Sequence, residues 1–239
     1  GPFQQLRERY PTAQLMECPG CTILPGFVDS HVHLTFSAGA NLSADLQSDS
    51  EARMLLQATR NAREALLAGV TTVRDLGSRD KLGLEVRDAI ADGIISGPRV
   101  LMSGRPITAV QGHLHQLGGV ATGVDEITNL TKSLIAEGVD CIKVMATGGN
   151  STPGSDPFTP AFSDREFETI VSLAEDAGLL VTAHARGVEG IRAVTNSGIH
   201  GIEHCRMEVP PGKWEFDEAL AKQIARNGTT AAPTLAASY

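Results

Sequence analysis

Two kinds of apolar pattern alternate along the chain, and together they predict a succession of strands and helices. Short runs of β-branched and apolar residues bounded by Gly, Pro or Asp are typical of buried strands, whereas apolar residues spaced three and four apart are typical of helices. The predicted strands lie within residues 22–34, 71–77, 99–104, 141–147, 179–185, 201–205 and 229–235. The predicted helices lie at about residues 50–67, 81–93, 125–137, 163–178, 188–198 and 217–228. This alternation indicates βαβ units and a parallel α/β sheet.

The positions of the polar residues favour a (β/α) barrel among parallel-sheet folds. No GxGxxG or Walker loop follows the first strand, which argues against a dinucleotide-binding sheet. Polar residues recur at the carboxyl ends of successive strands, where barrel enzymes keep their chemistry. A Gly-, Pro- and Ser-rich stretch, residues 148–162, follows the fourth strand and is a candidate substrate-binding lid.

Length and charge narrow the class of protein. The chain has 239 residues, 41% of them hydrophobic, which is ample for one large core without a disulfide or metal needed for folding. A formal net charge of -8 argues against nucleic acid or an anionic membrane as a partner. No apolar run reaches the roughly 18 residues of a membrane span. We therefore expect one large domain, and neither nucleic acid nor a membrane as its partner; these numbers say nothing about catalysis.

The cysteines carry little information about chemistry. Four of them are too few for a disulfide scaffold of this size, and they are compatible with a reducing cytoplasm, which is the expected location. Cys18-Pro-Gly-Cys21 has redox or zinc spacing, but it precedes a strand instead of a helix and no second CxxC is present. We expect a turn with incidental cysteines. The chain begins Gly-Pro, so removal of a leader is compatible with the sequence.

The first strand carries titratable groups that a core strand does not need. Side chains at i and i+2 share a face of a strand, so Asp29, His31 and His33 are expected on one side. Two adjacent imidazoles form part of a metal site, although a hydrogen-bonded histidine pair is the alternative. His184 and His204 each stand near the end of another predicted strand. Four histidines at one end of a barrel favour metal binding.

Lys143 lies between Ile142 and Val144 in a predicted interior strand. A buried ammonium group is costly, and burial lowers the pKa of a lysine. A neutral amine reacts with carbon dioxide to form a carbamate, whose oxygens are long-reaching anionic ligands able to bridge two metals. We therefore interpret Lys143 as a metal ligand.

Four segments resemble the metal-dependent amidohydrolase superfamily. They are "PGFVDSHVHL", "IKVMATGG", "TAHARG" and "GIEHC", and they occur in the order typical of its imidazolonepropionase-related and prolidase-like branch. That branch includes Xaa-Pro and Xaa-Arg dipeptidases and related amidases. The resemblance implies a (β/α)8 barrel, here covering about strands one to seven, with a small β-sandwich built from both chain ends.

The resemblance also assigns roles to individual residues. It implies that His31 and His33 hold one divalent metal ion and that His184 and His204 hold a second. Carbamylated Lys143 would bridge the two ions. Zinc is the expected metal, although Co, Mn and Fe accept the same ligands. His113 falls where the family places a substrate-contacting histidine, and Lys143 and His113 are the catalytic candidates.

Three other polar residues have less defined roles. His115 is a further candidate for substrate binding, and His200 is expected at a solvated turn between a helix and a strand. Arg186 either pairs with a substrate carboxylate or forms a salt bridge at the rim.

The sequence departs from the family pattern at both ends. Residues 1–21 are predicted to be a remnant of the β-sandwich or a linker, and residues 22–239 an incomplete hydrolase barrel. The family places a metal-binding, general-base Asp after strand eight, which is expected beyond residue 239. A truncated barrel is expected to be weakly active alone.

The expected reaction is hydrolysis of an amide or peptide bond in a dipeptide or N-acyl amino acid by a metal-bridging hydroxide. Two alternatives stay open. A phosphotriesterase or lactonase would use the same site on another electrophile. A catalytically incompetent barrel fragment would serve as a scaffold or assemble with another chain. The sequence is compatible with a homo-oligomer whichever function is correct.

Overall fold

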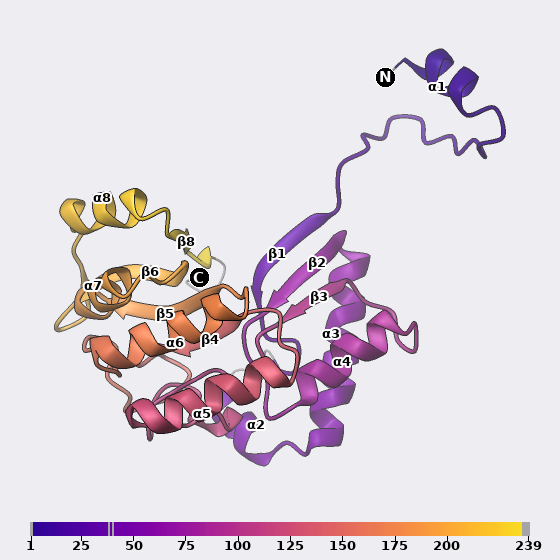
Figure 1. The fold of residues 1–239 in the computed structure, drawn as a ribbon. Helices are drawn as coiled ribbons and strands as arrows, with labels where there is room; N and C mark the ends of the chain where they lie inside the picture. Colours follow the sequence, from indigo (N-terminus) through magenta and orange to yellow (C-terminus); the bar gives the residue numbers. More distant parts are fainter. Residues whose placement is uncertain (1, 38, 40, 236–239) are drawn as a thin grey trace.

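The strands and helices of the chain follow the predicted alternation (Figure 1). The structure, a computed structural model, describes residues 2–37, 39 and 41–235. Its strands are β1 (Phe27–Val32), β2 (Val70–Asp75), β3 (Arg99–Met102), β4 (Ile142–Met145), β5 (Val181–Gly187), β6 (Gly201–Val209), β7 (Lys213–Trp214) and β8 (Thr230–Ala232). Its helices are α1 (Phe3–Arg9), α2 (Leu42–Ser48), α3 (Glu51–Leu67), α4 (Leu82–Ala91), η1 (His115–Leu117), α5 (Gly123–Ala136), α6 (Asp164–Asp176), α7 (Val188–Asn196) and α8 (Glu218–Arg226).

The parallel strands neighbour one another in chain order, as in a (β/α) barrel. One sheet has the order β1-β2-β3, and the other contains β4-β5-β6, with β8 parallel and β7 antiparallel to β6. The backbone N–H of Asp140 donates to the carbonyl of Met102 at 2.8 Å, and Ile107 forms a bridge to Val144. These contacts join the two sheets, so β4 is an interior strand.

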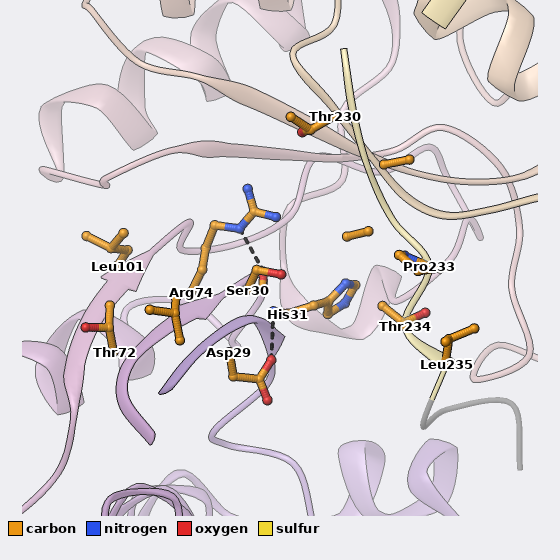
Figure 2. Close-up of a pocket in the computed structure, with 13 residues that line it drawn as sticks. Asp29, Ser30, His31, Thr72, Arg74, Leu101, Thr230, Pro233, Thr234 and Leu235 are labelled. Atoms are coloured by element: carbon orange, nitrogen blue, oxygen red, sulfur yellow. Dashed lines mark hydrogen bonds between the residues drawn. The ribbon is translucent and has the colours of Figure 1, made fainter. Parts of the chain in front are cut away.

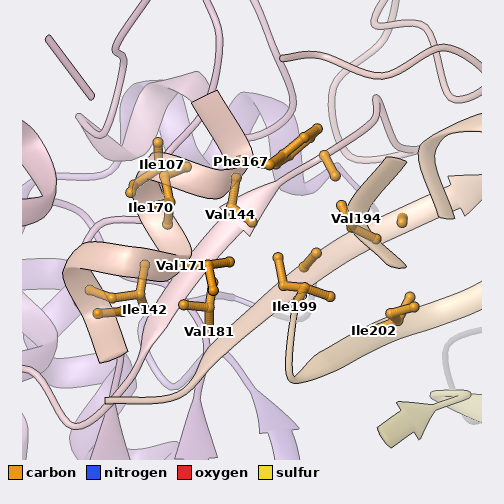
Figure 3. Close-up of a cluster of buried hydrophobic side chains, with 14 of the residues drawn as sticks. Ile107, Ile142, Val144, Phe167, Ile170, Val171, Val181, Val194, Ile199 and Ile202 are labelled. Carbon is orange, nitrogen blue, oxygen red and sulfur yellow. The ribbon is translucent and has the colours of Figure 1, made fainter. Parts of the chain in front are cut away.

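The helices pack their apolar faces on the outer side of the strands. A cluster of buried side chains from β4, β5, α6 and α7 includes Val144, Val181, Phe167 and Val194 (Figure 3). Burial of such side chains supplies roughly 25 cal/mol per Å² of apolar area, which makes this layer the main source of stability. The apolar core therefore lies between the strands and the helices. The carboxyl ends of the strands are not needed for this packing and are available for a functional site.

Local signals set the helix ends as the sequence predicts. Ser163 and Glu166 form a capping box at the start of α6, with the Ser163 N–H donating to Glu166 Oε2 at 2.8 Å. Gly138 and Gly178 have φ values of 79° and 71°, which favour glycine, and each follows the end of a helix. These caps fix where the chain turns back towards the next strand.

Some elements were not predicted, and β1 is shorter than predicted. Residues 22–26 are exposed and precede the strand, because pairing with β2 begins at Phe27, opposite Val70. Helices α1 and α2, the turn η1 and strand β7 have no clear apolar period; α1 has no buried residue, and α2 buries only Leu46 among its own residues. Such short elements depend on tertiary contacts more than on pattern.

The N-terminal segment extends away from the rest of the chain (Figure 1). Residues 2–21, predicted as a sandwich remnant or linker, contain α1 and no strand within the part that is described. The division of the chain at residue 21 stays a prediction. Among the described residues, no helix is long and apolar enough to cross a membrane.

A groove of about 670 Å³ separates β1 from residues 230–235 (Figure 2). Asp29, His31 and Arg74 line one wall, and Thr234 and Leu235 line the other. Within the described residues β1 pairs only with β2, and Phe27 and Val28 are 58% and 69% exposed. The barrel is therefore open between its first strand and β8.

Candidate metal centre

Six of the residues singled out in the sequence line one cavity of about 250 Å³. They are His31, His33, His113, Lys143, His184 and His204. The residues come from β1 and the position after it, from β4, β5 and β6, and from the turn that precedes η1. Parallel strands bring their carboxyl ends to one side of the sheet, which explains why residues distant in sequence meet here.

The imidazole rings are close neighbours. Ring centroids lie 5.3 Å apart for His31 and His33, 5.1 Å for His31 and His204, and 4.6 Å for His184 and His204. His113 lies 4.3 Å from His184 by the same measure. Strands β1, β5 and β6 and the turn before η1 thus bring these imidazoles into a single polar cluster.

Burial keeps these imidazoles neutral. It lowers the pKa of His33 and His184 well below the usual imidazole value, and neighbouring positive groups lower these values further. Burial and the Lys143 charge lower the pKa of His113 and of His204 to about 3. Neutral imidazole is the form that binds a metal.

Lys143 is fully buried, and its ammonium nitrogen has no hydrogen-bond partner among the described residues. Burial lowers the pKa of Lys143 to about 8, although the carboxylate of Glu203 acts to raise it. A buried polar group without a partner is costly and is rarely retained without a use.

The middle of β6 has an unusual backbone at His204. The φ values of His204, Cys205 and Met207 are 69°, 47° and 50°, in the left-handed region that residues other than glycine rarely adopt. Each such residue costs on the order of 1 kcal/mol or more. Adjacent residues of a regular strand point to opposite faces, whereas here both Glu203 and His204 contact groups at the cavity.

Hydrogen bonds to side chains and backbone carbonyls hold four of the histidine rings in place. His31 Nδ1 lies 2.7 Å from Glu203 Oε2, and His204 Nδ1 lies 2.6 Å from the Thr234 hydroxyl. His33 Nδ1 lies 3.0 Å from the carbonyl of Gly77, and His184 Nε2 lies 3.0 Å from that of Gly148.

Glu203 is a residue that the sequence analysis missed. Its side chain is fully buried beneath the cavity. Burial acts to raise its pKa, but hydrogen bonds from His31 and Thr182 and the charge of Lys143 together lower the pKa to about 2. A glutamate inside the apolar run Gly201–Cys205 was a signal of the same kind as Lys143 in β4.

Asp75 is a second missed residue, at the end of β2. It is fully buried and accepts the backbone N–H of Leu34 at 2.8 Å and that of Gly77 at 3.0 Å. Burial raises the pKa of Asp75 to about 7. The first of these amides follows His33 in the chain, and the second belongs to Gly77, whose carbonyl lies 3.0 Å from His33 Nδ1. Asp75 therefore connects the residues that follow β1 to the residues that follow β2.

Other predicted residues lie outside the cavity lining. His115 belongs to the η1 turn, where its Nδ1 lies 3.0 Å from the carbonyl of Gly112, so the alternation of a strand does not bring it beside His113. His200 lies at a turn, as expected, and its Nδ1 accepts the Val181 N–H at 3.2 Å. Asp29 is exposed and lines the outer groove, because an irregularity between Asp29 and Val32 breaks the strand alternation.

Arg186 occupies the rim, where it pairs with Glu208 at 2.8 Å and with the side chain of Asn150. It also lines a smaller space of about 130 Å³ that adjoins the cavity and shares His113, His184 and His204 with it. The rim salt bridge, one of the two alternatives for Arg186, is present; contact with a substrate stays a prediction.

The stretch 148–162 covers the cavity from the side of β4. Ser151 lines the cavity, and the Thr152 hydroxyl accepts the backbone N–H of Leu114 at 2.9 Å. Gly149 lies against the imidazoles, since a Cβ atom there would be 2.7 Å from His113 Nε2 and 2.9 Å from His184 Cε1. The stretch is thus in direct contact with the cluster.

The donor set suits divalent metal ions. Within the described residues, no group of three or more His, Cys, Asp or Glu side chains is already arranged around one ion. The fit rests instead on the chemistry of the donors: neutral imidazoles and an unpartnered, buried Lys143 nitrogen share one cavity.

Comparison with known protein sequences identifies the family of the chain. The sequence profile of the amidohydrolase family matches residues 22–235. The chain is 31% identical to ochratoxinase from Aspergillus niger over 210 residues, which is 76% of this chain and 43% of that protein. It is 28% identical to imidazolonepropionase from Micrococcus luteus over 232 residues, 84% of this chain and 55% of that protein.

Solved structures of a dipeptidase and a prolidase have the same fold as this chain. A Xaa-Pro dipeptidase with bound methionine superposes with a TM-score of 0.77 at 28% identity, over 89% of this chain and 54% of that one. A prolidase complexed with N-methylphosphonate-L-proline superposes with a TM-score of 0.78 at 27% identity, over 93% and 58%. The chain therefore spans about half the length of the relatives it matches, and its fold is that of their barrels.

Proposed function

Because the chain belongs to the amidohydrolase family, whose members generally use divalent metal ions, we propose that it forms the metal-binding part of a hydrolase. The bond cleaved is an amide or peptide bond in a small substrate, a dipeptide or an N-acyl amino acid. The observation that carries this proposal is the convergence of five neutral imidazoles and a buried lysine in one cavity.

His31, His33, His184 and His204 would hold two divalent ions, with zinc as the expected metal and a carbamate on Lys143 between them. Metal ions bound there would acidify water and polarise a carbonyl oxygen. The burial that keeps the imidazoles neutral supports this assignment, since no proton has to be displaced at neutral pH.

The carbamate on Lys143 would form by reaction of its neutral amine with carbon dioxide. The lone pair of the neutral Nζ attacks the carbon of carbon dioxide, the N–C bond forms, and one C=O electron pair moves to oxygen. The nitrogen then releases a proton to solvent, which leaves a carbamate with one negative charge. The lowered pKa of Lys143, about 8, supports the step because a larger fraction of the amine is neutral than in an exposed lysine.

His113 is the proposed substrate-contacting residue. It is 5% exposed, and its Nδ1 has no hydrogen-bond partner among the described residues. With its pKa lowered to about 3 by burial, the ring stays neutral and can exchange one hydrogen bond with a substrate. Arg186, on the rim beside it, is the candidate for a substrate carboxylate.

The first test compares metal content and carbamate in the parent, Lys143→Ala and Lys132→Ala. Lys132 is an exposed residue of α5 and serves as the matched control. We expect about two metal ions per chain in the parent and in Lys132→Ala, and fewer in Lys143→Ala. Incubation with ¹³C-bicarbonate should give a carbamate NMR signal that only Lys143→Ala lacks. Unchanged metal content in Lys143→Ala would contradict the proposed role.

The reaction class is tested with a substrate panel on the metal-loaded chain and on longer forms of the protein. Turnover of Xaa-Pro, Xaa-Arg or N-acyl substrates above that of paraoxon and lactones supports amide hydrolysis. The reverse order would favour a phosphotriesterase or lactonase instead.

A further inference from the structure

The carboxylate of Glu203 contacts His31, a proposed metal ligand. Its Oε2 lies 2.7 Å from Nδ1 of His31, and the two residues are on strands β6 and β1, at opposite sides of the barrel opening. An ionised carboxylate only accepts hydrogen bonds, so Nδ1 of His31 must be the donor. A neutral imidazole with its proton on Nδ1 has an unprotonated Nε2.

The other oxygen of Glu203 is held by two further donors. Arg74 Nη2 and the Thr182 hydroxyl each lie 2.7 Å from Oε1. Arg74 Nε also donates to the carbonyl of Ser30 at 2.8 Å, next to His31 in the chain (Figure 2). The arginine therefore fixes both the carboxylate and the backbone that carries the imidazole.

We propose that Glu203 is a positioning residue, which holds His31 in the tautomer with an unprotonated Nε2 available to a metal ion. The inference rests on the proposed function, because it gives His31 a metal to bind. Carboxylates that accept from the second nitrogen of a ligating imidazole orient the ring and strengthen metal binding, commonly by about 10–100-fold.

A purely structural role for the pair of Glu203 and Arg74 is the competing explanation. A buried carboxylate needs a cation or other donors whatever its function. The two explanations differ in what happens to His31 when the charge of Glu203 is removed, because an ion pair for stability alone does not require a defined imidazole tautomer.

The variant Glu203→Gln distinguishes the positioning role from the purely structural role. An amide has one oxygen, for which Arg74 and Thr182 compete, and its NH₂ group then faces His31 and donates to Nδ1. We expect His31 to change to the tautomer with its proton on Nε2. Long-range ¹H–¹⁵N NMR of the metal-free chain reports the tautomer directly, and Zn²⁺ titration by calorimetry reports affinity.

Two controls are matched to this variant. Glu137→Gln breaks a partly buried ion pair with Arg105, also 2.7 Å long, away from the cavity. Thr182→Val removes one donor to Glu203 and keeps the carboxylate. We expect both to keep the His31 tautomer and the parent affinity for Zn²⁺, whereas Glu203→Gln loses about 10–100-fold in affinity.

The outcomes are distinct. A proton on Nε2 of His31 in the parent overturns the proposal, and this measurement needs no variant to fold. Parent-like tautomer and Zn²⁺ affinity in a folded Glu203→Gln also overturn it. A parent that binds no Zn²⁺ while its His31 carries the proton on Nδ1 overturns the proposed function and confirms the tautomer assignment.

Discussion

At the scale of single residues, the cavity is defined by groups that are costly to bury. Lys143, Glu203 and Asp75 are all fully buried, and each has a pKa displaced from its usual value. Strongly displaced pKa values cluster at functional sites because burial and charge are arranged there for chemistry. The buried charge of Glu203 is stabilised by three hydrogen-bond donors, whereas Lys143 has no partner among the described residues. Lys143 is therefore the buried group that most needs a ligand.

Asp75 gives a pH-dependent prediction. Its pKa is raised from 3.8 to about 7 in the fold, mainly by burial, so between these values the folded chain binds a proton that the unfolded chain releases. The contribution of Asp75 to stability therefore falls as pH rises from about 4 to about 7, with a slope of at most about 1.4 kcal/mol per pH unit.

The measurement is urea unfolding of the parent and Asp75→Asn at several pH values in that range. We expect the free energy of unfolding of the parent, relative to Asp75→Asn, to decrease as pH rises. Taking the difference removes the opposite contribution of the histidines, whose lowered pKa values favour the fold as pH rises. A difference that is constant with pH would show that Asp75 keeps its charge in the fold.

At the scale of elements, the site depends on strand ends and on the turns that follow them. The middle of β6 has left-handed backbone at His204, and the stretch 148–162 lies against His113 and His184. Strain and close backbone approaches persist where the surrounding structure enforces them, and they are concentrated at functional sites. The geometry of the site therefore depends on the irregular backbone of β6 and on the stretch 148–162.

Gly149→Ala tests the close approach of this stretch. The added Cβ atom would lie 2.7 Å from His113 Nε2 and 2.9 Å from His184 Cε1, so the rings or the backbone must move. We expect Zn²⁺ affinity and turnover to fall, and displacement of a reacting group by about 1 Å costs on the order of 10²-fold in rate. Calorimetry and steady-state kinetics give both quantities.

Gly154→Asn is the matched control in the same stretch. Gly154 has a φ of 88°, which asparagine tolerates better than most residues, and a Cβ atom there would meet no described atom within 4 Å. This variant should keep the parent affinity and turnover. Equal losses in both variants would mean that the stretch needs its flexibility instead of its contact with the imidazoles.

At the scale of the whole molecule, the barrel has an exposed strand edge. Val28 of β1 is 69% exposed, and Leu101 of β3 is 40% exposed on the same open side, next to the groove between β1 and residues 230–235. Exposed, apolar strand edges are templates for pairing with another chain. Because β1 pairs only with β2 among the described residues, we propose that the chain self-associates through this edge.

Val28→Lys tests this expectation, because an edge lysine disfavours edge-to-edge pairing. Size-exclusion chromatography with light scattering should show self-association of the parent that increases with concentration and is reduced in Val28→Lys. Leu56→Lys is the control, since Leu56 is 73% exposed but lies on helix α3. A monomeric parent, or equal effects of both lysines, would contradict pairing at β1.

The sequence by itself determined the alternation of the longer strands and helices, the helix ends near Gly138 and Gly178, and the candidate cluster of histidines with Lys143. These follow from local rules: apolar periodicity, capping, and the cost of a charge inside an apolar strand. The same rule applied to Glu203 would have found it, since that residue also interrupts a short apolar strand.

Only the tertiary structure decided which of these residues meet. His115 lies outside the cavity lining because a turn, not a strand, follows His113, and Asp29 lies in the outer groove because β1 is irregular. The pairing of His31 with Glu203 joins residues 172 positions apart, and the hydrogen bonds to Asp75 come from backbone amides. Such contacts depend on strand register and on the closure of the barrel, which no local pattern of residues encodes.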